Sequence, residues 1–354
     1  MTSPLVAPFA TLALKDRAAV GGKGASLGEL TQAGIAVPPG FVLTTAAFER
    51  FLADFDSDGT IRRSIAALDP ADLPAISALS AEVRARIERA ALPVEVVAAI
   101  ARAYSELAAA DAEAPVAVRS SATSEDSAAA SFAGLQDTHL WVRGEDSVLG
   151  SVRSCWASLY STESVSYRLR LRLPEEHVAM GVVIQRMVNA LCSGVMFTRS
   201  PTSGDRSVIT IEGSWGLGSC IVSGEVTPDK FVVSKVTGEI CNRTISQKHH
   251  QHVPNRASGG VCAQSVEETR QSIPCLSDEE ILALSELGKR IERHYGTPQD
   301  IEWSIGSERK SANGIFILQS RPETVWAGRD AQPLAAPRAR PFDHVLAVLG
   351  GRDR

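Results

Sequence analysis

The sequence has no long apolar run, no excess of basic residues and no closely paired cysteines. No stretch approaches the roughly 20 apolar residues that are needed to cross a bilayer, so we expect a soluble protein. The formal net charge is −5 at pH 7, and this balance gives no overall field that would attract nucleic acid or anionic lipid. Any anionic ligand must therefore be held by local cations.

The cysteines form neither a CxxC motif nor a metal-ligand spacing, and the N-terminus shows no basic and apolar signal sequence. These absences predict a protein of the reducing cytoplasm. The six cysteines are Cys155, Cys192, Cys220, Cys241, Cys262 and Cys275.

With 354 residues, of which 44% are hydrophobic, the chain can bury a core, and its length predicts two or three lobes. We expect an N-terminal lobe with a helical insert over residues 1–115 and a central mixed α/β lobe over residues 116–245. A C-terminal portion with a metal-binding hairpin should follow over residues 246–326, and a linker or tail over residues 327–354.

Apolar spacing of three and four predicts a short helix over residues 25–32, several helices within 60–113, and further helices within 147–172 and over 278–295. Residues 246–276 show no periodicity. Short β-branched runs predict strands at "THLWV", "VVIQRMV", "SGVMFT", "SVITIEGSW", "KFVVSK", "DIEWSI" and "GIFILQSR".

The stretch "GGKGASLGEL" places glycines on both sides of Lys23 just before a helix. Glycines let backbone N–H groups approach an anion, and the helix start and the lysine add positive charge. The spacing is not that of a Walker A motif. The stretch is thus either a phosphate cradle or a plain structural turn.

In "VAVRSSATSED" a short apolar strand ends at Arg119 and is followed by hydroxyl and acidic residues. A guanidinium at the end of a buried strand can bind two phosphate oxygens through its planar fork. The alternative is that Arg119 pairs with Glu125 or Asp126 and that the following residues begin a helix.

The last two predicted strands would form a hairpin with Glu302 opposite Gln319 and with Arg321 beside them. A carboxylate and an amide oxygen suit a hard cation such as Mg²⁺, and Arg321 can neutralise a phosphate oxygen. In this prediction Gln319 and Arg321 share a strand face with Ile317. The alternative is a surface hairpin with an ordinary ion pair.

The glycine-rich stretch "EGSWGLGS" suggests a loop in which Gly216 and Gly218 let the backbone approach a ligand and Glu212 joins a metal or ribose shell. Gln185 could contact an adenine edge or its ribose; a structural role in the sheet is the alternative. The stretch "HHQH" over residues 249–252 is interpreted as a solvated loop, not a metal site.

In their order along the chain, these motifs resemble the N-terminal ATP-binding region of phosphoenolpyruvate synthase, pyruvate phosphate dikinase and rifampin phosphotransferase. The likeness spans roughly residues 10–325 and includes "GIAVPPGFVLTTAAF", "SFAGLQDTHLWV", "VTPDKF" and "LQSRP". The resemblance implies an α+β fold of the ATP-grasp type, in which two α/β lobes with a helical insert close on ATP and Mg²⁺.

The resemblance also implies roles for particular residues. It makes Lys23, Arg119 and Arg321 the phosphate-binding and catalytic cations. Further nucleotide and metal contacts are implied for Gly134 and Thr138 in a lid, for Gln185, and for Glu302 and Gln319 as metal ligands.

Two departures from the family shape the functional prediction. Ser219 stands where the family usually has a glutamate, whose role would be lost or would pass to Glu212. No histidine has the "SHxA"-like setting of the family's phosphorylated residue. The histidines are His139, His177, His249, His250, His252, His294 and His344.

The chain therefore resembles the smaller, ATP-binding subunit of phenylphosphate synthase and of cresol-phosphorylating enzymes. This implies a partner subunit that carries the histidine and the acceptor-binding domains, with a phenol-like hydroxyl compound as the final acceptor. The alternatives are the ATP region of rifampin phosphotransferase or phosphoenolpyruvate synthase, an independent ligase that forms an acyl-phosphate, and a non-catalytic nucleotide-sensing subunit.

Overall fold

A computed structural model describes most of the chain. The described residues are 3–108, 113–123, 137–175, 178–255, 259–307 and 314–326. Gly134, Glu125, Asp126 and the predicted tail over residues 327–354 lie outside them. Residues 1–323 form one compact unit, which contains every helix and strand given below.

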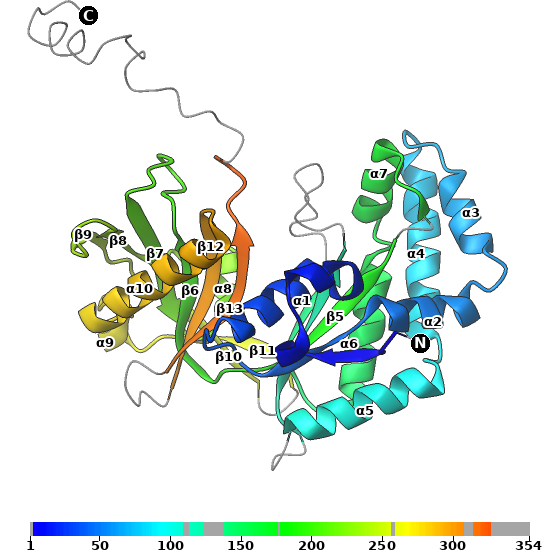
Figure 1. Cartoon of the computed structure of the whole chain (residues 1–354), viewed down its shortest axis with the longest axis horizontal. Helices are drawn as coiled ribbons and strands as arrows, with labels where there is room; N and C mark the ends of the chain where they lie inside the picture. The colour runs from blue at the N-terminus through cyan, green and yellow to red at the C-terminus, as the bar shows by residue number, and fades with distance from the viewer. Residues whose placement is uncertain are drawn as a thin grey trace, which may run out of the picture. The chain divides into compact units, whose positions relative to one another are not determined.

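An antiparallel sheet of five strands, which includes β5, occupies one side of this unit (Figure 1). Its strand order is β1-β2-β5-β3-β4. Successive side chains of its central strand point to opposite faces: Val183 packs beneath one helix, and Ile184 packs in the main core on the other face. The strands are β1 Val6–Pro8, β2 Gly40–Leu43, β3 Val116–Ala122, β4 Thr138–Val142 and β5 Met180–Arg186.

A group of helices covers the main-core face of this sheet, as the sequence predicted for residues 60–113 and 147–172. Their core centres on Trp156, whose ring stacks on Phe51 at 5.0 Å and lies 5.6 Å from Phe48. The helices are α2 Thr45–Phe55, α3 Thr60–Ala66, α4 Leu73–Arg89, α5 Val94–Ala108, α6 Glu145–Ser158 and α7 Thr162–Leu171.

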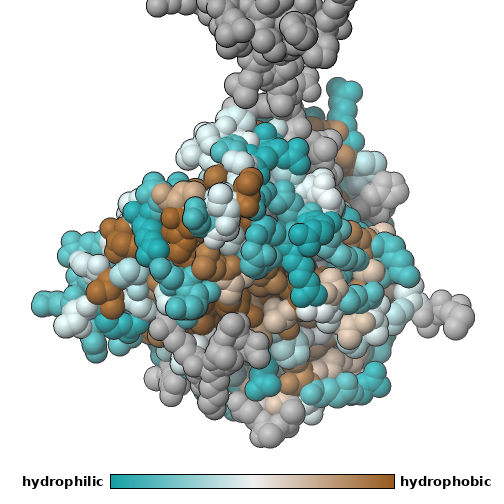
Figure 2. All heavy atoms as spheres, turned by 60° about the vertical axis from the view of Figure 1, so that its left-hand side comes forward, coloured by the Kyte–Doolittle hydropathy of each residue, from teal (hydrophilic) through white to brown (hydrophobic). Residues whose placement is uncertain are grey.

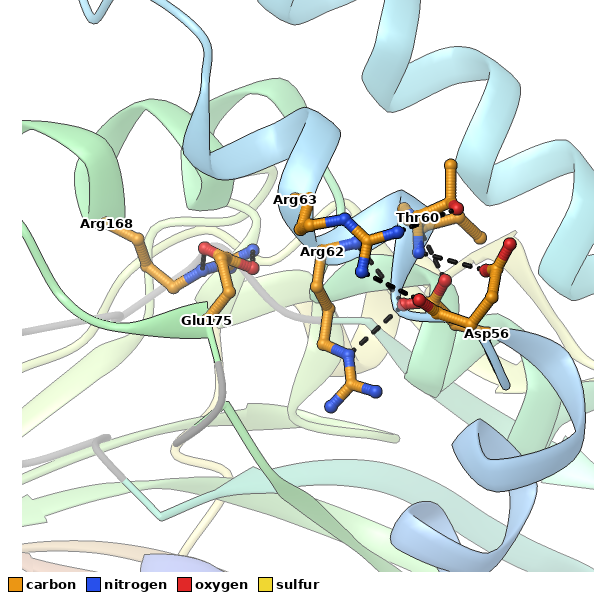
Figure 3. A network of polar contacts seen from close by, with 8 residues as sticks. Asp56, Thr60, Arg62, Arg63, Arg168 and Glu175 are labelled. Carbon is orange, nitrogen blue, oxygen red and sulfur yellow. Dashed lines mark hydrogen bonds and ion pairs between the residues drawn. The ribbon is translucent and has the colours of Figure 1, made fainter.

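Two buried charge clusters hold this helical group together (Figure 3). The Asp56 carboxylate, 2% exposed, pairs with Arg62 Nε at 3.1 Å and accepts a hydrogen bond from the backbone N–H of Ile61 at the start of α3. Arg168 and Glu175 pair at 2.9 Å with side chains only 3% and 4% exposed. Loss of one partner would leave a buried charge without its counterion, so both clusters are structural.

A second antiparallel sheet has six strands in the order β13-β12-β6-β7-β8-β9. On the side of the unit that carries it, apolar side chains gather in the middle of the surface with hydrophilic ones around them (Figure 2). Its strands are β6 Ala190–Phe197, β7 Val208–Trp215, β8 Asp229–Ser234, β9 Ile240–Thr244, β12 Gln299–Gly306 and β13 Ile315–Pro322.

Helix α10, Asp278–Tyr295, covers one face of the second sheet and buries Leu284 and Ile291 beside Trp303. Its predicted N-cap is confirmed: Ser277 Oγ accepts a hydrogen bond from the Glu280 N–H, and the Glu280 carboxylate accepts one from the Ser277 N–H. The opposite face of this sheet forms part of the candidate site described below.

Helix α1, Arg17–Gln32, packs against strands of both sheets. Gly24 N–H donates to Ser121 Oγ of β3 at 3.1 Å, and Ser26 Oγ donates to the Ser320 carbonyl of β13 at 2.7 Å. The helix breaks at Gly21, where φ is +72°. The glycine-rich turn predicted before residues 25–32 is therefore a break within a longer helix.

The mixture of helices and antiparallel sheets confirms the α+β class. Residues 246–276, which show no periodicity in the sequence, contain regular structure: β10 His250–Pro254 and β11 Val261–Ser265 form a hairpin, and α9 Glu268–Gln271 follows. Nearly all of this hairpin is at least partly exposed, so it lacks the alternation of a half-buried strand. Among the described residues, no helix has both the length and the apolar character of a membrane span.

Candidate functional site

A cavity of about 350 Å³ opens between the two sheets. Strands β3, β4 and β5 supply one wall, and β6, β12 and β13 supply the other. Most of its lining is apolar, including Leu140, Met187, Val195, Leu217 and Leu318. Its polar groups are Arg119, Thr138, Gln185, Arg186, Ser193, Ser219, Ser223, Glu302 and Ser304.

Arg119 reaches from β3 across this cavity to the β12–β13 hairpin. Its Nη2 donates to Glu302 Oε2 at 3.0 Å and to Gln319 Oε1 at 2.7 Å, and its Nη1 donates to the Leu318 carbonyl at 3.3 Å. The Arg119 side chain is 12% exposed and that of Glu302 is 33% exposed. Within the described chain, Arg119 Nε is buried without a hydrogen-bond partner. The Arg119 guanidinium thus links the two sheets, and its Nε–H could still donate a hydrogen bond to a ligand.

Arg119 was expected at the end of its strand, and the structure corrects this. Strand β3 continues to Ala122, and Arg119 is its one partly exposed residue. The predicted alternative, pairing with Glu125 or Asp126, falls on residues outside the described chain. Its described acidic partner is Glu302, 183 residues away.

The predicted pairing of Glu302 with Gln319 is confirmed by the register of β12 and β13. Directly opposed residues share a face, and the register continues this row across the sheet from Glu302 to Val195, Glu212 and Lys230. Glu212 lies two strands from Glu302 and pairs with Lys230 at 3.6 Å. It does not line the cavity.

A bulge in β13 contradicts the predicted face of Ile317. Glu302 pairs with Gln319, but Trp303 pairs with Ile317, so Leu318 is the extra residue. Ile317 is buried in the core with Trp303, and Gln319 faces the site. Without the bulge, strict alternation would have placed both residues on one face.

Arg321 lies two residues beyond Gln319 and pairs with Asp300 of β12 at 3.5 Å. Asp300 is 20% exposed and its Oδ1 has no hydrogen-bond partner among the described residues. Burial raises the pKa of Asp300 to about 6; the Arg321 charge opposes this rise and the Glu323 charge adds to it. Arg321, 43% exposed, is outside the cavity lining.

Lys23 follows the break in α1 and is half-buried. A Cβ on Gly21 would lie 1.9 Å from the Ser121 carbonyl oxygen, so only glycine allows α1 to approach β3 this closely. Burial raises the pKa of the Cys155 thiol on α6, and the Lys23 charge opposes that rise. Lys23 does not belong to the cavity lining.

Gln185 and Thr138 both line the cavity. Gln185 is 3% exposed, and its Nε2 donates to the Pro38 carbonyl at 3.3 Å. Thr138 is exposed and pairs with Arg119 across β3 and β4. Gly134, predicted beside Thr138 in a lid, is outside the described residues.

One glycine of the glycine-rich loop is needed for packing against β10, and not for access to a ligand. Gly218 lines the cavity, but Gly216, with φ of +75°, is pressed against β10: a Cβ there would lie 2.4 Å from the His252 carbonyl oxygen. Ser219 Oγ lies 2.8 Å from His252 Nδ1, and His252 Nε2 lies 3.1 Å from Glu225 Oε2. The interpretation of "HHQH" as a loop was therefore wrong.

Asp300 and His252 were not assigned to the site from sequence. Asp300 could have been found, since it shares a strand face with Glu302 two residues later. His252 had no such signal, because its contacts depend on a hairpin that periodicity did not reveal.

The donors present fit a hard divalent cation. Glu302 offers a carboxylate and Gln319 an amide oxygen, and both now bind the one guanidinium. Mg²⁺ prefers few protein carboxylates together with water and phosphate oxygens. No group of three or more histidine, cysteine or acidic residues suited to a metal occurs in the described parts of the chain, so phosphate or water would have to complete the shell.

Comparison with known proteins gives the class of this chain. It belongs to the family of the pyruvate phosphate dikinase AMP/ATP-binding domain, which it matches over residues 17–340.

Among its relatives, a probable phosphoenolpyruvate synthase from Methanothermobacter thermautotrophicus is 42% identical over 321 residues, covering 90% of this chain and 46% of the relative. A rifampicin phosphotransferase from a Streptomyces species is 42% identical over 326 residues, covering 92% of this chain and 36% of the relative. The chain spans less than half of the length of these relatives.

Proposed function

We propose that this chain is the ATP-binding subunit of a dikinase-type phosphotransferase with an ATP-grasp-type fold. It binds ATP and Mg²⁺, and the β-phosphoryl group of ATP passes to a histidine on a partner subunit. The α–β bond breaks to release AMP, and water cleaves the β–γ bond to release the γ-phosphoryl group as phosphate. The observation that carries the proposal is the contact of Arg119, from one sheet, with Glu302 and Gln319 of the other.

That contact combines the charges that a phosphate and metal site requires. Arg119 satisfies the carboxylate of Glu302 now; a phosphate would take the guanidinium fork, and Glu302 would then be free for a cation. When bound, Mg²⁺ would neutralise phosphate oxygens and orient them for transfer. The unpartnered Nε of Arg119 gives the fork a further donor for the same anion.

Lys23 and Arg321 would add positive charge to the proposed site. Lys23 is tied to β3 through the neighbouring Gly24 and Ser121, and Arg321 follows Gln319 on β13. Preorganised cations stabilise the charge that spreads over a phosphoryl group in transfer. We assign both residues to phosphate binding.

The rest of the cavity suits the base of the nucleotide. Leu140, Met187, Val195 and Leu217 provide apolar walls, and Gln185 adds a buried amide. Such a combination, apolar walls with few polar groups, is typical of small-molecule sites. Glu212 is left out of the proposed site because it lies two strands from Glu302 and pairs with Lys230 on the neighbouring strand.

The acceptor is proposed from the sequence. No histidine of the chain has the family's phosphohistidine setting, and a mobile nucleophile can reside on a second polypeptide. We propose a phenol- or cresol-like hydroxyl compound as the final acceptor. A second candidate is the ATP region of a phosphoenolpyruvate synthase or a rifampicin phosphotransferase; the names and greater lengths of the relatives favour it.

Product analysis tests the proposal. The chain is incubated with Mg-ATP, alone and with the histidine-bearing protein encoded beside it, and the products are identified by mass spectrometry. We expect AMP and a phosphorylated histidine only in the presence of the partner. ADP formed by the chain alone would contradict the proposal and indicate a self-contained ligase or kinase.

A further inference from the structure

The β10–β11 hairpin contacts the loop that forms one end of the proposed nucleotide cavity. Loop residues Leu217, Gly218, Ser219 and Val222 line that cavity. The helix within the loop, α8 Ser219–Val222, has four residues. One helical turn is not stable by its own hydrogen bonds, so the loop needs contacts from outside to keep its shape.

His252 supplies three of these contacts from one residue. Its carbonyl accepts a hydrogen bond from the Leu217 N–H at 2.9 Å. Its ring nitrogens lie 2.8 Å from Ser219 Oγ and 3.1 Å from Glu225 Oε2. The ring is 15% exposed. His252 thus contacts the loop over residues 217–225 at three positions, which are Leu217, Ser219 and Glu225.

Both ring contacts are satisfied together by one tautomer. With the proton on Nε2, the ring donates to Glu225, and Nδ1 accepts from the Ser219 hydroxyl. The hydroxyl proton of Ser219 then points to His252, and its lone pairs are left for a donor in the cavity. A nucleotide carries such donors on its sugar hydroxyls and, in adenine, on its amino group.

We propose that His252 is a positioning residue for the nucleotide. It fixes the loop over residues 217–225 and orients Ser219 as a hydrogen-bond acceptor toward the sugar or base. The inference rests on the proposed function, because it takes the cavity to be the ATP site. His252 touches neither the phosphates nor the metal donors in this scheme, so its loss should weaken binding without impairing phosphoryl transfer from bound ATP.

Calorimetric titration of the purified chain with Mg-ATP tests this, with three substitutions beside the wild type. We expect His252→Ala to raise the Kd about tenfold, the loss of roughly one hydrogen bond. His252→Asn can still accept from Ser219 and should recover most of the affinity, whereas His252→Gln should recover less. The matched control is His250→Ala, an exposed histidine on the same strand whose backbone, among the described residues, forms no hydrogen bond with the backbone of the loop.

Ser219→Ala separates positioning from a merely structural role. In the His252→Ala background it should cause no further loss, because the two residues act as one unit. A His252→Ala affinity within twofold of the wild type, or equal affinities for the Asn and Gln variants, would overturn the inference. If His252→Ala does not fold, the Asn and Gln pair decides alone. Wild-type protein that does not bind ATP would instead remove the proposed function itself.

Discussion

Three side chains define the centre of the proposed site: Arg119, Glu302 and Gln319. The guanidinium is nearly buried, its two acceptors come from a different sheet, and the contact closes over 183 and 200 residues of sequence. Arg119 is held in position by its ion pair with Glu302 as well as by packing. Substitutions here should change ligand binding more than folding.

Replacing Glu302 by Gln removes a metal-binding charge and keeps the shape of the side chain. We expect the Mg²⁺ concentration that gives half-maximal activity to rise by about tenfold or more, because a carboxylate is the stronger ligand for a hard cation. The matched control is Glu212→Gln, in the same cross-strand row but paired with Lys230. An equal effect of both substitutions on the Mg²⁺ requirement would contradict the assignment of Glu302.

The variants Lys23→Ala and Arg321→Ala test the two cations that we assign to phosphate binding. Neither side chain is buried in the core, so both variants should fold with unchanged circular dichroism. We expect each to reduce phosphoryl transfer by about 100-fold or more, the cost of losing a preorganised charge at a transferring group. A double variant that keeps wild-type activity would remove both residues from the site.

At the scale of elements, the proposed role of Lys23 depends on the close approach of α1 to β3. Gly21→Ala combines a positive φ with a clash against Ser121, whereas Gly238→Ala has a similar φ of +75° and no atom within 4 Å of the new Cβ. We expect the control to lose about 1 kcal/mol of unfolding free energy and Gly21→Ala about 3 kcal/mol or more. Urea denaturation measures both, and equal losses would show that α1 does not need this approach.

Helices α1 and α10 are joined by Glu29, which accepts from the Leu14 N–H at 3.1 Å and lies 2.7 Å from His294 Nε2. The Leu14 N–H, with the His294 ring, lowers the pKa of Glu29. A lowered pKa stabilises the fold at pH values above the ordinary one and loses this effect as the pH falls through the folded-state pKa.

We therefore expect Glu29→Gln to cost about 1 kcal/mol of unfolding free energy at neutral pH. The difference from the wild type should shrink as the pH falls below the ordinary value of 4.5. The control is Glu286→Gln, a 70% exposed carboxylate on α10, which should change little at any pH. If the difference in unfolding free energy between the wild type and Glu29→Gln increased at acidic pH, this account would be contradicted.

The sequence predicted those features that depend on the spacing of residues close together in the chain. The capped helix over residues 278–295 and the opposition of Glu302 and Gln319 followed from periodicity and from one hairpin. The bulge at Leu318 broke strict alternation, and the exposed β10–β11 hairpin lacked a hydrophobic pattern. The partners of Arg119 depend on how two sheets meet, which no local spacing encodes.

For the whole molecule, the family assignment covers residues 17–340 and fixes the class of nucleotide-binding domain. The relatives are more than twice as long as the region that matches this chain. The proposed function requires a second protein component that carries the histidine, and the decisive experiment tests this requirement.

The most direct measurement follows the two terminal phosphates of ATP separately. The chain and the histidine-bearing protein encoded beside it are incubated with ATP labelled in the β or in the γ position, and the label on protein is measured. We predict that the β label reaches the partner's histidine while the γ label is released as phosphate. The γ label on protein, together with ADP, would contradict the account and indicate an ordinary kinase.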